Sequence, residues 1–501
     1  MFSQLARRLR GGVFAATLVL VSACGTSREF AGPVSPEGVP SAGREFRAAW
    51  IATVANIDWP TRPGLPVAAQ KDELRALLDQ AAALHLNAIV FQVRPMADAF
   101  YRDGHEPISF YLTGRMGDDP GWDPLEFAIE ESHRRGLELH AWFNPYRAGH
   151  PSSGPPDSTH VQVAHPDWVL KYGELYWLDP GNPAAREHSL RVIEDVVTRY
   201  DLDGIHVDDY FYPYPIQDGA GNRIDFPDST SRAAVGVPAE TQAISDWRRA
   251  QVDGFIRGMY ERTKAVKPWV KVGISPFGIW RPGFPPGVRG FDQYEGLYAD
   301  ARLWLREGWV DYFTPQLYWA ISSEGQPYEP LLRWWTAENV TKRHLWPGNY
   351  ASRILAVGGG DWEPQEIVDQ VRVTREVTDG NVHFSMKALM PGHGVGEALA
   401  DQVYDEPALV PATDWLGGKP PASPRVVIRQ VGDGWVLDMR PGDSGDEPFA
   451  WHVRVRYGRR WDVLVIPAWT GIVELEKNPS RVVVSAVNRL GQEGPTTDVT
   501  H

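Results

Sequence analysis

The sequence predicts an α/β protein, a (β/α)8 or TIM barrel followed by a small C-terminal β-sandwich. Three observations support this fold class. From Glu45 onward, short apolar runs alternate with longer amphipathic runs, which is the pattern of repeated strand–helix units. Eight such units occur, the number that closes a parallel barrel. After about residue 405, short alternating runs separated by turn residues favour an antiparallel sandwich.

The N-terminal segment has the features of a bacterial export signal. Arg7, Arg8 and Arg10 precede an apolar run that is too short to span a bilayer and that ends in small residues before Cys24, the only cysteine. This pattern resembles a lipobox. We therefore expect a signal peptide over residues 1–23, a lipid anchor on Cys24 that attaches the protein to the membrane, and a flexible tether over residues 24–43. Gly25 is similar to the residue found here in outer-membrane lipoproteins that face the periplasm, which is the predicted location.

The remaining chain divides into a barrel over residues 44–405, a Pro- and Gly-rich linker over 406–422, and a sandwich over 423–501 that resembles a fibronectin type III domain. Trp435 is expected to be the core Trp of that sandwich. The predicted barrel strands are Phe46 to Thr53, Ala88 to Val93, Glu138 to Phe143, Gly204 to Asp208, Lys271 to Ser275, Asp311 to Leu317, His344 to Asn349, and Val382 to Leu389. The predicted helices include residues 71–84, 124–135, 183–200 and 245–267.

Alternation along these strands predicts which side chains face the barrel lumen, because successive side chains point to opposite faces. The apolar face should pack on the helices, and the polar face should end at the C-terminal mouth, where TIM-barrel enzymes keep their sites. The polar faces that we expect in the lumen contain Gln92 and Arg94; His140, Trp142 and Asn144; His206 and Asp208; Thr314, Gln316 and Tyr318; and Ser385 and Lys387.

The most informative stretch is Asp203 to Pro213, where an apolar strand ends in Asp208 and Asp209 and then in a cluster of aromatic residues. Carboxylates serve glycosidic chemistry, and rings fit the apolar faces of pyranoses. The plainer interpretation is an Asp pair that caps the start of a loop. Asp208 has the lumen-facing parity of His206, whereas Asp209 reaches the site only if the chain turns.

Composition narrows the classes of function. The formal net charge of −14 makes nucleic acids and anionic membrane surfaces poor partners, and 21 Trp, 18 Tyr and 18 Phe suit carbohydrate binding. We find no convincing phosphate-binding loop or dinucleotide fingerprint, and we expect no cofactor. A metal-dependent polysaccharide deacetylase would need a second pair of histidines, and His160 and His165 fit poorly because they stand five apart in a loop. We therefore expect no metal.

Several motifs together resemble the glycosyl-hydrolase-like 10 proteins, also called the YngK-like family, over about Arg44 to Gln402. The resemblance implies a barrel glycosidase of the bacterial envelope, and some members are similar to hydrolases of peptidoglycan glycan strands. The motifs that carry it are Arg47-Ala-Ala-Trp50, Asn56-Ile-Asp-Trp-Pro60, Phe91-Gln-Val-Arg-Pro95 with Asp98, Ala141-Trp-Phe-Asn-Pro-Tyr-Arg147, Trp177-Leu-Asp-Pro-Gly-Asn182, Asp203-Gly-Ile-His-Val-Asp-Asp-Tyr210, Gly273-Ile-Ser-Pro-Phe-Gly278 and Asp311-Tyr-Phe-Thr-Pro-Gln-Leu-Tyr318.

The motif that ends in Asp208 is also similar to the fourth-strand motif of α-amylase-type barrels, which implies that Asp208 is the nucleophile. Those enzymes have an acid Glu after the fifth strand, and residues 272–277 contain no carboxylate. The acid is then Asp209, Asp98, Glu295 or Asp300, with Asp209 preferred for proximity. Alternatively, the acetamido group of the substrate attacks, Asp208 orients it and Asp209 protonates the leaving oxygen. The predicted substrate-binding residues are Arg94, Asp98, Asn144, Arg147, His206, Tyr210, Gln316, Tyr318 and Lys387.

The resulting hypothesis is a glycoside hydrolase that cleaves a polysaccharide of the cell envelope, either peptidoglycan glycan strands or a related amino-sugar polymer. A non-catalytic glycan-binding lipoprotein is the main alternative. It would keep the aromatic residues and Arg94 and would tolerate the loss of Asp208.

Overall fold

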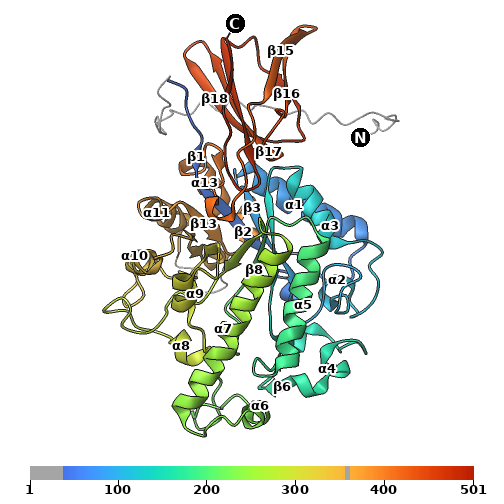
Figure 1. Cartoon of the computed structure of the whole chain (residues 1–501), viewed down its shortest axis with the longest axis vertical. Coiled ribbons are helices and arrows are strands. Elements are labelled where there is room, and N and C mark those ends of the chain that lie inside the picture. Colours follow the sequence, from blue (N-terminus) through green and yellow to red (C-terminus); the bar gives the residue numbers. More distant parts are fainter. Residues whose placement is uncertain (1–37, 356–361, 501) are drawn as a thin grey trace, which may run out of the picture.

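The computed structural model describes residues 38–355 and 362–500, so the predicted signal peptide, Cys24 and most of the predicted tether lie outside the described residues. A nine-stranded parallel sheet forms the centre of the molecule, with its strands in the order β11-β10-β9-β8-β4-β3-β2-β13-β12 (Figure 1). These strands are β2 (Phe46–Ile51), β3 (Ala88–Arg94), β4 (Glu138–Phe143), β8 (Gly204–Val207), β9 (Lys271–Ile274), β10 (Tyr312–Phe313), β11 (His344–Leu345), β12 (Gly348–Asn349) and β13 (Gly380–His383).

The sheet closes into a barrel because β11 and β12 are two parts of one chain segment. The backbone N–H groups of Trp346 and Gly348 donate to Phe313 and Pro315 on the β10 side, and the N–H of Val382 donates to Pro347 on the β13 side. The strands therefore form eight barrel positions, and their order around the barrel follows the chain. The predicted TIM barrel is confirmed.

Helices surround this barrel (Figure 1), and the four helices predicted from the sequence are present within a few residues. In α5, Pro183 occupies the first turn and the Asn182 side chain accepts from the N–H groups of residues 184 and 185, which fixes where the helix begins. The longer helices are α1 (Val67–Ala83), α3 (Pro124–His133), α5 (Pro183–Arg199), α7 (Thr241–Val266), α9 (Ala301–Glu307), α10 (Tyr328–Glu338), α11 (Pro364–Arg375) and α13 (Val395–Gln402). Short helices are α2 (Phe110–Thr113), α4 (Val161–Ala164), α6 (Ser229–Ala234), α8 (Gln293–Gly296) and α12 (Met386–Leu389).

The two faces of the strands pack as their alternation predicts. Ile89 and Phe91 belong to the large core between strands and helices, as do the apolar residues of β4 and β8 with the same parity. The lumen holds a separate cluster that includes Val90, Trp142 and Tyr312. Burial of both faces explains why every residue of β3, β4, β8 and β9 is buried.

Two predicted strands are several residues shorter in the structure. Pro315 follows β10 closely, and only two isolated bridges at Gln316 continue the pairing, with residues 277 and 348. The eighth strand was predicted over residues 382–389, but β13 ends at His383 and residues 386–389 form α12. This prediction was wrong because a distant carboxylate, Asp58, accepts hydrogen bonds from the Ser385 hydroxyl (2.6 Å) and the Lys387 N–H (2.9 Å) and so organises a helical turn there.

The C-terminal region forms two antiparallel sheets, β15-β16-β19 and β18-β17-β20-β21, around a second apolar core. This is the predicted sandwich-like arrangement. Trp451 is fully buried in its core, whereas Trp435, which we expected there, only packs against it. The strands are β15 (Arg425–Val431), β16 (Gly434–Arg440), β17 (Pro448–Tyr457), β18 (Arg460–Pro467), β19 (Ile472–Leu475), β20 (Arg481–Asn488) and β21 (Thr497–Thr500).

These sheets lie against the N-terminal ends of the barrel strands (Figure 1). The Arg489 guanidinium pairs with Asp201 (2.6 Å) and with the buried Asp203 (3.0 Å), which directly precedes β8. The Trp415 indole donates to Asp311 at 2.9 Å, and the short strands β1 (Gly43–Arg44) and β14 (Ala408–Leu409) pair in parallel. In the described part of the chain, no helix combines the length and apolar character needed to cross a membrane.

Candidate active site

The loops at the C-terminal ends of the barrel strands lie at the end of the molecule away from the C-terminal sheets, near the labels β6 and α6 in Figure 1. Three of these loops bring most of the predicted site residues together. The segment after β4 supplies Asn144 and Arg147, the segment after β8 supplies Asp208, Asp209 and Tyr210, and the segment after β10 supplies Gln316 and Tyr318.

Asp208 is held in a fixed position at this mouth. Its side chain accepts from the Trp142 indole at 3.1 Å and from the Asn144 amide at 3.3 Å and 3.4 Å, and the Tyr210 N–H lies 3.4 Å from it. The residue is only 4% exposed. Trp142 lies on the neighbouring strand and was also predicted to face the lumen. Its contact with Asp208 therefore agrees with the lumen-facing position predicted for Asp208.

Asp209 lies beside it and is 3% exposed. The Tyr214 hydroxyl donates to its carboxylate, and the Gln316 amide is a second hydrogen-bond partner. The N–H of Phe211 donates to the Asp209 carbonyl at 3.1 Å, so the chain turns directly after the pair. The parity of Asp209 points it away from the lumen, and we expected it to reach the site only if the chain turns. The structure contains this turn.

Burial governs the protonation of both carboxyls. Loss of water raises the pKa of Asp208 to about 7, although the Arg147 guanidinium opposes this and the neighbouring Asp209 adds to it. Burial also raises the pKa of Asp209, against the hydrogen bonds from Tyr214 and Gln316. Since two negative charges are costly in one buried site, the pair favours a state in which one carboxyl is protonated and the other ionised.

Arg147 provides the positive charge of the site. Its guanidinium lies 4.1 Å from the centre of the Tyr210 ring, and its backbone N–H donates to the Asn144 side chain at 2.9 Å. Asn144 therefore connects Arg147 to Asp208, because its amide nitrogen donates to that carboxylate while its amide oxygen holds the arginine backbone. Burial, together with the nearby carboxylates, raises the pKa of Tyr210 to about 12.

Aromatic side chains surround the pair. Burial, with help from Asp208 and Asp209, holds the pKa of both Tyr214 and Tyr318 well above its usual range. Tyr318 stacks on Tyr350 with 5.0 Å between ring centres. Trp142 was predicted to face the lumen but not to belong to the site, and neither Tyr214 nor Tyr350 was predicted there. The aromatic run after Asp209 was the available signal for Tyr214, whereas Tyr350 had none.

Arg94 and Asp98, both predicted to bind substrate, lie behind the site. Arg94 is fully buried, pairs with Glu106 at 2.5 Å, and donates to the carbonyls of Asn144 and Pro145 at 2.6 Å and 3.0 Å. Arg94 thus fixes the backbone of the residue that contacts Asp208. Asp98 is also fully buried, and desolvation raises its pKa to about 6. Glu106 was not predicted from the sequence, because it lies in a loop without a recognisable pattern.

The other predicted residues occupy different places. His206 lies within the lumen, where it contacts the Ser275 hydroxyl at 2.8 Å and the Tyr312 hydroxyl at 3.0 Å, and burial lowers its pKa. Lys387 is exposed on α12. Of the alternative acids, Glu295 pairs with Arg249 at 3.3 Å, and Asp300 caps α9.

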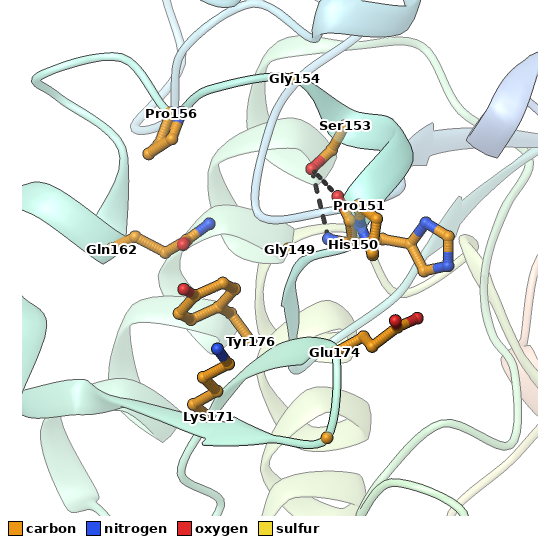
Figure 2. A pocket seen from close by; sticks show the side chains of 11 residues that line it. Gly149, His150, Pro151, Ser153, Gly154, Pro156, Gln162, Lys171, Glu174 and Tyr176 are labelled. Atoms are coloured by element: carbon orange, nitrogen blue, oxygen red, sulfur yellow. Dashed lines mark hydrogen bonds between the residues drawn. The ribbon is translucent and has the colours of Figure 1, made fainter.

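A cavity of about 490 Å³ lies on the small antiparallel sheet β5-β7-β6, on the face that carries Tyr176 (Figure 2). The sheet belongs to the segment after β4 and consists of β5 (Arg147–Gly149), β6 (Val169–Tyr172) and β7 (Leu175–Leu178). Lys171, Tyr176, Gln162, His150 and Glu174 contribute side chains to the cavity wall.

The described residues contain no cluster of three or more His, Cys, Asp or Glu side chains that could hold a metal ion. The two histidines considered for a deacetylase have other contacts. His160 is buried and lies 2.9 Å from the Met96 carbonyl, and His165 stacks on Trp168 with 3.7 Å between ring centres.

Comparisons with known proteins agree on a family. The model of a family described as Glycosyl hydrolase-like 10 matches residues 45–357. The chain is 43% identical over 417 residues to "Glycosyl hydrolase YngK" of Bacillus subtilis (strain 168), a match that covers 81% of each protein. It is 34% identical over 328 residues to "Glycosyl hydrolase DigH" of Escherichia coli (strain K12), covering 61% of this chain and 72% of that protein.

Among solved structures, the chain is similar to the glycoside hydrolase domain of PgaB (BpsB) from Bordetella bronchiseptica, with a TM-score of 0.47, 12% identity, and coverage of 72% of this chain and 99% of that one. It is also similar to α-L-fucosidase isoenzyme 2 from Paenibacillus thiaminolyticus, with a TM-score of 0.46, 13% identity, and coverage of 73% and 49%.

Proposed function

The chain belongs to the glycosyl hydrolase-like 10 family and is a glycoside hydrolase, and from this premise we propose that it cleaves a polysaccharide of the bacterial cell envelope. The proposed substrate is the glycan strand of peptidoglycan or a related amino-sugar polymer. The observation that supports this best is the pair Asp208 and Asp209, held by hydrogen bonds at the mouth of the barrel among tyrosine side chains.

The chemistry needs one group that protonates the leaving oxygen and one that meets the positive charge developing on the anomeric carbon. We assign the second role to Asp208, which is held by Trp142 and Asn144, and the acid role to Asp209, which is held by Tyr214. Because the pKa of Asp208 is raised to about 7, Asp208 must lose its proton before it can act as the nucleophile, so we expect turnover to rise as the pH passes through 7. Burial also raises the pKa of Asp209, which favours the protonated form that the acid role needs.

Two reaction schemes use these roles. In the first, Asp208 attacks the anomeric carbon, the bond to the leaving oxygen breaks, and the proton of Asp209 passes to that oxygen. Water then hydrolyses the glycosyl-enzyme with Asp209 as base. In the second, the carbonyl oxygen of a 2-acetamido group attacks instead, and Asp208 orients that group through its N–H. Only the second scheme requires an N-acetylated sugar.

The proposed substrate belongs to the cell envelope, and the N-terminal sequence resembles the signal of an exported lipoprotein. We infer that the protein is a lipoprotein anchored through Cys24 in the outer membrane and that it faces the periplasm, with the C-terminal sheets in a fibronectin-like role as a spacer. The support for this location is the lipobox-like pattern and Gly25.

The test is turnover of glycan strands from which the peptides have been removed, with products identified by mass spectrometry. We expect the wild type to release oligosaccharides and Asp208→Asn to be nearly inactive. Asp72→Asn is the matched control, since this carboxylate lies exposed on α1. Activity should persist in the presence of a chelator, and chelator-sensitive release of acetate would favour a deacetylase instead. Binding of the strands without any turnover would favour the non-catalytic glycan-binding protein.

A further inference from the structure

The two carboxylates divide the mouth of the barrel into two sides. Strand β8, which leads to both of them, lies between β4 and β9 in the sheet, and β10 follows β9. Asp208 is held from the β4 side by Trp142 and Asn144. Asp209 is held from the opposite side, because the Gln316 amide belongs to the segment after β10. A substrate that lies across the pair therefore meets the segments after β9 and β10 on the side of Asp209.

Phe277 lies on this second side, beside the groups that hold Asp209. It forms an isolated parallel bridge with Gln316, whose amide also donates to the Ser275 carbonyl at 2.9 Å. Its ring centre lies 6.5 Å from that of Tyr214, whose hydroxyl donates to Asp209. Phe277 has the parity of Ser275, whose hydroxyl makes its hydrogen bond within the lumen. Since Phe277 is half-buried, part of it is open to solvent next to the carboxylate.

Phe277 is the centre of a group of aromatic rings. Its ring centre lies 5.4 Å from that of Phe291 and 5.5 Å from that of Trp319, at interplanar angles of 84° and 82°. Phe291 also lies against Tyr214, with 5.2 Å between ring centres. Phe291 and Trp319 are half-buried like Phe277. The Asp209 side of the mouth therefore carries a partly exposed apolar surface, which is continuous with the tyrosine that holds this carboxylate.

The Trp319 ring is held in place by a close approach to the backbone. A Cβ atom at Gly278 would lie 2.8 Å from this ring and closer still to the Gln316 carbonyl oxygen, so the packing requires a residue without a side chain. The Gln370 side chain donates to the Trp319 carbonyl at 3.2 Å and fixes the other side of the residue. The ring therefore has a defined position relative to Gln316 and hence to Asp209.

The acid of a glycosidase stands on the side of the leaving group, because it protonates the oxygen of the departing sugar. With Asp209 as the acid, that sugar leaves on the side of β9 and β10. We propose that Phe277 and Trp319 form the subsite for the leaving-group sugar, whose apolar face lies against these rings. The inference rests on the proposed function and holds for both reaction schemes, since Asp209 is the acid in each. It also gives the bound glycan a direction, with its reducing-end part over the segments after β9 and β10.

The experiment compares two leaving groups that need the same proton. The first substrate is the glycan strand without peptides, which loses a sugar chain. The second is the methyl glycoside of the disaccharide that those strands release, which loses methanol and places no ring on this surface. Phe277→Ala and Trp319→Ala should each lower kcat/KM for the strand by about 3- to 10-fold, the loss expected for one aromatic contact, and leave the methyl glycoside unchanged. Phe277→Tyr keeps the ring and should retain turnover of the strand.

Trp269→Ala is the matched control, because this aromatic side chain is 39% exposed and precedes β9, at the other end of the barrel. It should change neither substrate. Equal losses on both substrates would mean that the rings act through Asp209 and would overturn the subsite, as would no loss on either.

A wild type that does not cleave the strand would remove the proposed function. Calorimetric binding of the strand by Asp208→Asn, with and without Phe277→Ala, then tests the ring by itself. Weaker binding in the double variant would support the contact with a sugar, and equal binding would overturn it.

Discussion

Replacing Asp208 by Asn should stabilise the folded protein while it removes most of the activity. Asp208 is 4% exposed, and burial raises its pKa from the usual 3.8 to about 7. The difference between these two pKa values corresponds to about 4 kcal/mol at roughly 1.4 kcal/mol for each pH unit. This is an upper bound on the free energy that the ionised carboxylate costs the folded state at pH 8.

The neutral amide avoids this cost but loses part of the hydrogen bonding. An Asn side chain still accepts from the Trp142 indole, whereas its NH2 group cannot accept from the Asn144 amide. That mismatch costs roughly 1–2 kcal/mol. We therefore expect Asp208→Asn to raise the free energy of unfolding at pH 8 by about 2 kcal/mol.

The pH dependence has a definite sign. Between about pH 4 and pH 7 the folded wild type keeps the Asp208 proton and the unfolded chain releases it, so the unfolded state binds fewer protons. The stability of the wild type therefore falls as the pH rises through this window. Asn does not titrate, so its advantage should be absent near pH 4 and complete above pH 7.

The assay is urea-induced unfolding of the wild type, Asp208→Asn and the exposed-site control Asp72→Asn at a series of pH values, with turnover of glycan strands measured on the same samples. Turnover of Asp208→Asn should fall by roughly two to four orders of magnitude. A variant that is less stable than the wild type at pH 8, or that has the same pH profile, would refute the electrostatic reasoning. Full activity in a folded variant would refute the catalytic role.

Three further predictions concern the contact between the barrel and the C-terminal sheets, the reaction scheme, and the lipid anchor. Arg489→Ala leaves the buried Asp203 without its arginine and should destabilise the protein by about 3 kcal/mol in urea unfolding, whereas Arg425→Ala, which breaks an exposed pair, should change it by less than about 1 kcal/mol. Fluorination of the acetamido group should slow turnover steeply if that group is the nucleophile, and rates that do not respond would support attack by Asp208. Cys24→Ser should move the protein from the membrane to the soluble periplasmic fraction, and a wild type found there without detergent would contradict the anchor.

Sequence alternation was sufficient for the barrel and for much of its mouth. Strands buried on both faces leave a regular pattern, so the outward packing of Ile89 and Phe91 and the lumen position of Trp142 could be predicted residue by residue. Because the C-terminal ends of all barrel strands meet at one mouth, the polar residues after β4, β8 and β10 were also expected near each other.

Contacts between residues far apart in the chain decided the rest. Asp58 lies 327 residues from Ser385, and its hydrogen bonds to that turn end the eighth strand where alternation predicted its continuation. Arg94 has the parity of a lumen residue in the sequence, but a register shift after Gln92 pairs it with Phe143, which packs in the core between strands and helices. There its guanidinium contacts Glu106 and the backbone of Asn144.

The sequence by itself determined the fold class, the family and the pair Asp208 and Asp209, because these depend on local patterns and on motifs in a fixed order. The tertiary structure alone decided which neighbours hold the pair and that Asp203, in the same motif, pairs with Arg489 at the opposite end of the barrel. The physical reason is that the pKa of a carboxyl and the role of a buried charge depend on the solvent and partners that surround it, and folding brings these partners from distant parts of the chain.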